Sequence, residues 1–159
     1  RPAQNKANPA AKIIINLRKI MCHFIHFTHK ETYQKIIQDG TIKPKNKTQK
    51  NATGGDPGMV SVFKNFDYND SKLVKKVKKA FTKMKNLPPS PAGWLLKDVV
   101  GILINAKNPS INWRSYEKEM RIDFNFIDGM DFNEEDFIKM GIYLKTNQEI
   151  PATDIVEII

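Results

Sequence analysis

The chain has 159 residues, of which 40% are hydrophobic and 27% are charged, and its formal net charge is +9 at pH 7. This length predicts one domain that is large enough to bury a hydrophobic core, and the composition is that of a folded globular protein. No apolar stretch approaches the roughly 18 residues of a membrane-spanning helix, so no membrane association is expected. The single cysteine, Cys22, excludes an internal disulfide and a zinc site built from several cysteines of this chain.

The charge is divided unevenly along the chain. Residues 1–85 carry 19 Lys/Arg and 5 Asp/Glu, whereas residues 86–159 carry 7 and 12. A basic first half favours an acidic partner, which could be a nucleic acid, a phosphate-bearing ligand or an acidic protein. A lysine-rich solvated helix gives the same count, so charge alone does not choose between binding and solubility.

The first residues differ in composition from the rest. Residues 1–12 contain two prolines and no large apolar side chain, which is typical of a linker or a disordered lead-in. We therefore expect a single domain over residues 13–159. The start without Met suggests a fragment of a longer protein.

An early strand and helix are expected between residues 24 and 40. Residues 24–29 form a compact apolar run rich in β-forming side chains, which predicts a strand. Thr28 and Glu31 match the S/T-x-x-E capping box, so a helix is expected over residues 29–39. Gly40 then provides a C-cap.

The later periodicities predict one long helix and several short strands. Leu73, Val77, Phe81 and Met84 recur at helical spacing within residues 70–85, and we interpret the lysines around them as a solubilising face. Extended segments are expected at 41–44, 59–63, 99–104, 141–144 and 154–159, with loops at 45–58 and 87–93; residues 13–20 and 133–140 fit either a helix or a strand.

Alternate residues from Glu117 to Phe126 separate a polar set from a mostly apolar one, which predicts a β-strand with one face in the core. Glu117, Glu119 and Arg121 would leave this strand on the same side, with the two carboxylates about 7 Å apart. Such a pair can act on one substrate. An ordinary strand with a charged outer face gives the same pattern.

Several other chemistries lack their sequence signals. His23, His26 and His29 recur every three residues, but in a strand His26 points away from the other two, so no metal site is expected. The chain has no G-x-S-x-G nucleophile elbow, no phosphate-binding P-loop and no dinucleotide-fold glycine motif.

Three separated features occur in a characteristic order. An early strand carries His26-x-Thr28 and is followed by a helix that ends at Gly40; a middle strand carries Ser61; a late segment carries Glu117-x-Glu119. Over about residues 22–159 the chain thus resembles the ADP-ribosyltransferase superfamily, particularly the small C-terminal toxin domains of bacterial polymorphic toxins.

The resemblance implies an α+β fold of two small, mostly antiparallel sheets that form an NAD cleft, with flanking helices. It assigns Glu119 as the catalytic glutamate and Glu117 as the residue that acts on the incoming nucleophile. The residues implied in cofactor binding are His26, Thr28, Ser61 or its rival Tyr68, and Arg121 or a loop lysine at the pyrophosphate. A carboxylate near the nicotinamide ribose would favour the oxocarbenium-like transition state of glycosidic bond cleavage.

The implied activity is an NAD-dependent mono-ADP-ribosyltransferase, delivered as a bacterial toxin fragment and acting on a protein or an RNA in the target-cell cytoplasm. A monomer is expected, with an acidic immunity protein as a partner. Three alternatives stay open: an NAD glycohydrolase of the same fold, a basic nucleic-acid-binding or nucleic-acid-processing domain, and an inactive adaptor. The histidine first motif and the E-x-E pair usually belong to different subgroups, which leaves the acceptor open.

Overall fold

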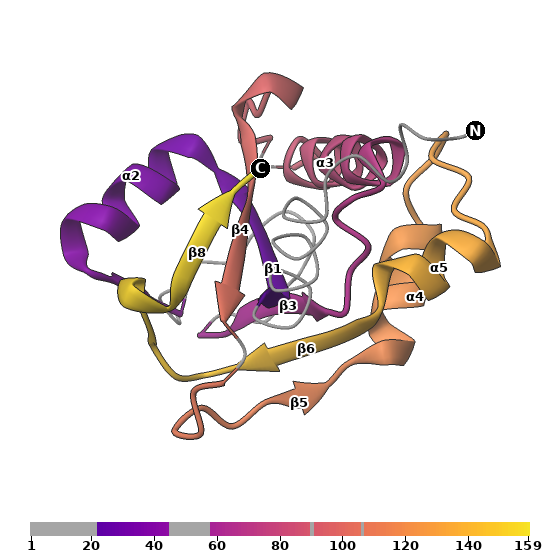
Figure 1. Ribbon diagram of the computed structural model, residues 1–159. Helices are drawn as coiled ribbons and strands as arrows, with labels where there is room; N and C mark the ends of the chain where they lie inside the picture. The colour runs from indigo at the N-terminus through magenta and orange to yellow at the C-terminus, as the bar shows by residue number, and fades with distance from the viewer. Residues whose placement is uncertain (1–21, 45–57, 90, 106) are drawn as a thin grey trace, which may run out of the picture.

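The structure is a computed structural model that describes residues 22–44, 58–89, 91–105 and 107–159 (Figure 1). The predictions for residues 1–12 and 13–20, and for most of the loop at 45–58, lie outside these residues. The side chains of Cys22 and His23 are also outside the description. The described residues form an α+β fold with a mostly antiparallel sheet and four α-helices, which confirms the predicted general class.

The elements of the described residues, in chain order, are β1 (Cys22–His29), α2 (Lys30–Asp39), β2 (Thr41–Ile42), β3 (Val60–Lys64), α3 (Ser71–Lys85), η2 (Leu96–Asp98), β4 (Val99–Asn105), β5 (Arg114–Ser115), α4 (Glu117–Asn125), α5 (Glu134–Met140), β6 (Ile142–Thr146), β7 (Ile150–Pro151), η3 (Ala152–Asp154) and β8 (Ile155–Ile158). The helix predicted at 70–85 and the strands predicted at 24–29, 59–63 and 99–104 are confirmed to within two residues at each end.

The described strands form a six-stranded sheet in the order β5-β6-β3-β1-β4-β8 and a two-stranded sheet of β2 and β7. β1 pairs with β4 from one end to the other, and β3 pairs with β6 over all five of its residues. Between β1 and β3, in contrast, only Phe24↔Lys64 and Ile25↔Phe63 are paired. Beyond these pairs the two strands diverge, and Figure 1 shows β4 and β8 steep in the view while β5 and β6 run across it.

The six-stranded sheet is itself partly divided, and the cleft between two small sheets that the resemblance implies stays a prediction. One half of the sheet is β5-β6-β3 and the other is β1-β4-β8, and the halves are joined at the start of β1. A gap within the sheet therefore lies between the end of β1 and the start of β3.

The two faces of the sheet carry separate cores, because successive side chains of a strand point to opposite faces. Ile25 and Phe63 pack with α3, α4 and α5 on one face. Phe24 and Val62 pack with α2 and the β2–β7 pair on the other. Figure 1 accordingly shows α2 on the opposite side of the molecule from α4 and α5.

The strand predicted for residues 117–126 is wrong, because these residues form α4. Met120 and Phe124 are only 1% and 2% exposed, whereas Ile122 and Phe126 are 68% and 77% exposed. Alternation would place all four side chains on one face of a strand. On the helix each pair four residues apart shares a side, so Met120 and Phe124 face the core while Ile122 and Phe126 face solvent.

The start of α2 also differs from its prediction. The N-cap is His29, whose Nδ1 accepts a hydrogen bond from the backbone N–H of Glu31 (3.1 Å), so the capping box expected from Thr28 is not formed. Gly40 ends the helix as predicted, with φ 76° in the left-handed region that favours glycine.

Candidate functional site

A cavity of about 570 Å³ opens where β1 and β3 diverge. Its lining includes His26 and Thr28 of β1, and Val60 and Ser61 of β3. Residues of α2 line it on one side of the sheet and residues of α3 and α4 on the other, so the cavity is bounded from both faces. Its volume lies within the range of about 300–1,000 Å³ that is typical of small-molecule sites.

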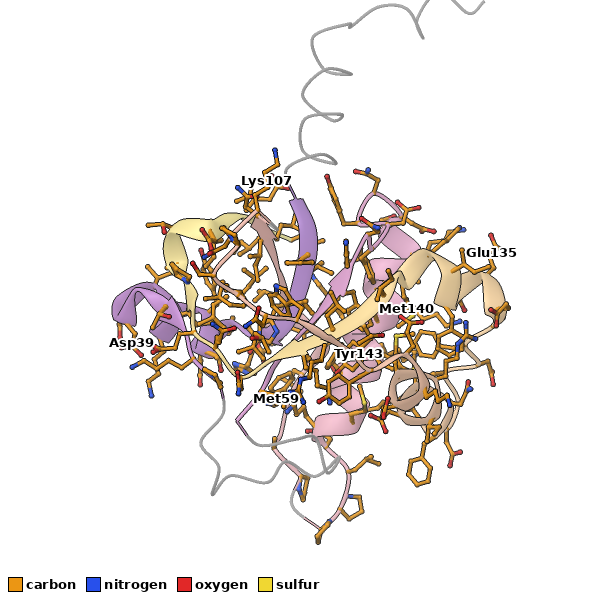
Figure 2. The ribbon with its side chains drawn as sticks, turned by 90° about the horizontal axis from the view of Figure 1, so that it is seen from below. Asp39, Met59, Lys107, Glu135, Met140 and Tyr143 are labelled. Atoms are coloured by element: carbon orange, nitrogen blue, oxygen red, sulfur yellow. The ribbon has the colours of Figure 1, made fainter. Side chains whose placement is uncertain are left out.

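The cavity combines aromatic rings with charged groups. Lys35, Lys43, Lys85 and Lys145 line it together with Asp39 and Asp123, so cations are in excess among these lining residues. The rings come from Phe81, Trp94, Phe124 and Tyr143. In Figure 2 Met59 and Tyr143 of this lining lie close together in the view, with Asp39 farther to the left on α2.

His26 bridges the gap between the two diverging strands. Its Nδ1 lies 2.6 Å from the carbonyl oxygen of Ser61. A carbonyl oxygen can only accept, so Nδ1 carries the hydrogen and donates it. In the neutral ring Nε2 is then the acceptor, because the hydrogen bond at one ring nitrogen sets the role of the other.

Thr28 and Ser61 lie on either side of the same gap. Thr28 is 7% exposed and is paired with Val100 of β4. Ser61 is half-buried and is paired with Lys145 of β6. Three residues predicted to bind the cofactor, separated by up to 35 positions in the sequence, therefore line one cavity.

Tyr68, the rival of Ser61, lies elsewhere. It lines a second cavity of about 390 Å³, together with Lys75, Lys78 and Leu96. Burial lowers the pKa of the Lys78 ammonium group. Tyr68 is not among the residues that line the cavity between β1 and β3.

Arg121 forms a structural ion pair. Its two guanidinium NH groups donate to both carboxylate oxygens of Glu134, at 2.6 and 2.9 Å, which links α4 to α5. This hydrogen bonding raises the pKa of the guanidinium and lowers that of the Glu134 carboxyl. The guanidinium also lies 4.9 Å from the ring centroid of Phe137. Arg121 does not line the β1–β3 cavity.

The two glutamates predicted to be catalytic both lie in the first turn of α4. Residues two apart on a helix are rotated by about 200°, so their side chains leave on nearly opposite sides, unlike those on a strand. Glu117 Oε1 accepts a hydrogen bond from the backbone N–H of Tyr143 (3.0 Å), and Glu119 is exposed. Neither lines the β1–β3 cavity, so their catalytic roles stay predictions.

The sequence reasoning missed Asp123 and Lys145 as cavity residues. Asp123 comes one turn after Glu119 on α4, but residues four apart share a face on a strand as well, so the local pattern did not single out Asp123 among the acidic residues of this segment. Lys145 had a visible signal, because it stands two residues after Tyr143 within a short apolar strand. Side chains two apart share a strand face, so a lysine on the tyrosine side was predictable as an inward-facing charge.

Trp94 is held at the cavity by the end of α3. Asn86, the C-cap residue, makes two hydrogen bonds to the backbone of Trp94, both at 2.8 Å. Its Oδ1 accepts from the backbone N–H of Trp94, and its Nδ2 donates to the Trp94 carbonyl oxygen. Lys85 Nζ lies 5.4 Å from the centroid of the Trp94 ring. These contacts with the end of α3 therefore fix the position of Trp94 at the cavity.

Comparison of the chain with protein-family models, curated proteins and solved structures found no match. Over the described ranges no three His, Cys, Asp or Glu side chains gather in a way that could hold a metal ion. Within the same part of the chain, no helix combines the length and the hydropathy needed to cross a bilayer.

Proposed function

We propose that the chain is an NAD-dependent mono-ADP-ribosyltransferase toxin domain and that the cavity between β1 and β3 binds NAD. The observation that carries this proposal is the convergence of His26, Thr28 and Ser61 on one cavity. The resemblance assigns all three residues to the cofactor, although they are up to 35 positions apart in the sequence. Their shared cavity supports the assignment.

The chemical character of the lining fits a dinucleotide. Lysine ammonium groups suit the negatively charged pyrophosphate, and the Thr28 and Ser61 hydroxyls suit ribose oxygens. The rings of Phe81, Trp94 and Phe124 offer surfaces for the nicotinamide and adenine bases. An acidic immunity protein that enters this lysine-lined cavity would block it.

The carboxylate that the geometry favours for the reaction is Asp123. It lines the cavity, whereas Glu117 and Glu119 do not. When the glycosidic bond breaks, its electron pair leaves with nicotinamide and positive charge develops on the ribose. A carboxylate beside that ribose stabilises the transition state more than the ground state. The acceptor then bonds to the ribose carbon and gives up its proton; in a glycohydrolase, water takes this place.

The test is nicotinamide release from NAD by the purified protein and by two matched variants of α4. Asp123→Asn should reduce release by about 100-fold or more, because the charge beside the ribose is lost. Glu119→Gln, one helical turn away, should change it by less than about tenfold. Addition of a bacterial lysate and labelled NAD distinguishes transfer to a macromolecule from plain hydrolysis.

The outcomes separate the alternatives. If the parent protein and Asp123→Asn release nicotinamide equally and Glu119→Gln is inactive, that result would assign the catalytic role to Glu119 instead of Asp123. Absence of release, with and without lysate, contradicts the proposed activity. Salt-sensitive binding of RNA or DNA at about 50 mM salt, without NAD cleavage, would favour the nucleic-acid alternative.

A further inference from the structure

Lys145 is a buried lysine on a strand of the six-stranded sheet. It lies on β6, between β3 and β5, and is only 7% exposed. Lysine is almost never buried to this extent unless its charge is compensated, because removal of an ammonium group from water is costly. Lys145 also lines the cavity between β1 and β3.

Two tyrosine rings hold the Lys145 ammonium group. Nζ lies 4.8 Å from the ring centroid of Tyr116 and 5.5 Å from that of Tyr143. Tyr116 is fixed to β6 by a backbone hydrogen bond from its N–H to the Tyr143 carbonyl (2.9 Å). The negative faces of the rings attract the cation.

Ser61 lies directly across from Lys145 in the β3–β6 register. Side chains of such a pair leave the same face of the sheet, with Cβ atoms about 4.5–5.5 Å apart. Both residues line the β1–β3 cavity. One ammonium group and one hydroxyl therefore offer hydrogen-bond donors to the same part of the cavity, where low exposure strengthens charge interactions.

We infer that Lys145 and Ser61 form a subsite that binds the pyrophosphate of a dinucleotide. The inference rests on the proposed function and adds to it the residues that hold the anionic part of NAD. Lys35 and Lys43 line the same cavity but are exposed, and Lys43 Nζ is 3.9 Å from the Asp39 carboxylate. Their charges are screened by solvent, so they contribute less.

Binding of three probes to three variants tests the subsite. The probes are inorganic pyrophosphate, ADP-ribose and adenosine, and affinities are measured by calorimetry. Lys145→Met retains the apolar stem and removes the charge; it should weaken pyrophosphate and ADP-ribose binding by about 10- to 100-fold and leave adenosine binding unchanged. Lys145→Arg retains the charge and should weaken pyrophosphate and ADP-ribose binding less than Lys145→Met does. Lys118→Met, a control at an exposed lysine of α4 that does not line the cavity, should change all three affinities by less than about threefold.

A second measurement on the unsubstituted protein covers the case in which Lys145→Met does not fold. The Lys145 Nζ resonance, assigned by its loss in Lys145→Arg, should shift when pyrophosphate saturates the protein. An unmoved resonance, or no pyrophosphate binding, overturns the inference. So does an equal loss of adenosine and ADP-ribose affinity in Lys145→Met, because that pattern indicates a purely structural lysine. The dinucleotide assignment would be overturned if a short single-stranded RNA shifted the Lys145 Nζ resonance and bound more tightly than ADP-ribose.

The two proposals fail in different ways. If ADP-ribose binds through Lys145 but no nicotinamide is released from NAD, the subsite stands and the proposed activity fails. If NAD is cleaved and Lys145→Met leaves its KM unchanged, the activity stands and the subsite fails.

Discussion

His26 has two separable roles in this structure. Its Nδ1–H donates to the Ser61 carbonyl across the gap between β1 and β3, and its ring lines the cavity. The first role stabilises the fold at the point where the sheet divides. The second places the imidazole beside a ligand that fills the cavity.

Substitution of His26 by Ala and by Asn should separate these roles. His26→Ala leaves the half-buried Ser61 carbonyl without this donor and should lower the free energy of unfolding by about 1–2 kcal/mol. The amide of His26→Asn can replace the Nδ1–H donor, so it should retain most of that stability. Both variants lack the imidazole ring that lines the cavity and should bind ADP-ribose about tenfold more weakly.

Urea unfolding and calorimetry check this pair of expectations. Unchanged ADP-ribose affinity in His26→Asn would show that the imidazole does not contact the ligand, whatever its effect on stability.

The sequence predicted part of the site at the level of residues. His26, Thr28 and Ser61 lie on strands that the sequence predicts correctly, but the resemblance rather than a local pattern grouped them, and their part in cofactor binding stays a prediction. Glu117, Glu119 and Arg121 lie on α4, where the helix turns Glu119 away from the other two instead of placing all three on one side. The place of Asp123 at the cavity depends on contacts between segments far apart in the chain, which no local pattern contains, whereas Lys145 had a local signal in its position two residues after Tyr143 on one strand.

At the scale of elements, α4 is the segment where local patterns conflict. The apolar residues of 117–126 alternate with polar ones, as on a strand. The buried residues Met120 and Phe124 are also spaced as on a helix, and a segment of about ten residues is too short for the sequence to separate the two patterns. Packing decides the outcome, because Phe124 contacts Phe63 of β3 and Phe81 of α3 at ring-centroid distances of 5.9 and 5.8 Å.

Alanine at Met120 and at Ile122 tests the helix directly. Both side chains would face the core of a strand, so both substitutions would cost a similar amount. On the helix, Met120→Ala should cost about 2–5 kcal/mol because a buried side chain is lost. Ile122→Ala should change stability by less than about 0.5 kcal/mol, since the side chain is exposed and alanine favours helices. Chemical denaturation of the two variants gives the comparison; equal, large losses would contradict α4.

At the scale of the whole molecule, ion pairs connect segments that are distant in sequence. The Leu73 backbone N–H, followed by Lys139, lowers the pKa of the Asp70 carboxyl, and Lys30 lowers that of Asp98. At Asp136 burial opposes ionisation, but the hydrogen bond from Lys76 prevails and the pKa is lowered. These contacts join α3 to α5 and α2 to the residues before β4.

Stability should therefore fall in acid. A carboxyl whose pKa is lower in the folded state stabilises the fold fully above its ordinary pKa, which is 3.8 for Asp. That contribution is lost as the pH falls through the lowered folded value. Thermal unfolding between pH 7 and pH 2.5 should show the midpoint decreasing below about pH 4. Asp70→Asn should lower stability at pH 7 and flatten the decrease; a slope identical to that of the parent would contradict the role of Asp70.

The overall fold was predictable in its class and in its first half, where strand, helix and Gly40 cap follow one another with strong local signals. The division of the sheet was not, because it depends on how few residues of β1 and β3 pair. Strand pairing is a contact between distant segments, and the position where it stops is decided by packing of the two cores on either face rather than by either strand alone.

The most direct test of the central claim is an NMR titration of the isotope-labelled protein with ADP-ribose. Backbone amide resonances of His26 and Thr28 in β1 and of Ser61 in β3 should shift together, because one ligand occupies the gap between these strands. Resonances of Tyr68 and Leu96, at the second cavity, should stay in place. Shifts confined to the second cavity, or none at millimolar ADP-ribose, would contradict the claim that the divergence of β1 and β3 creates the NAD site.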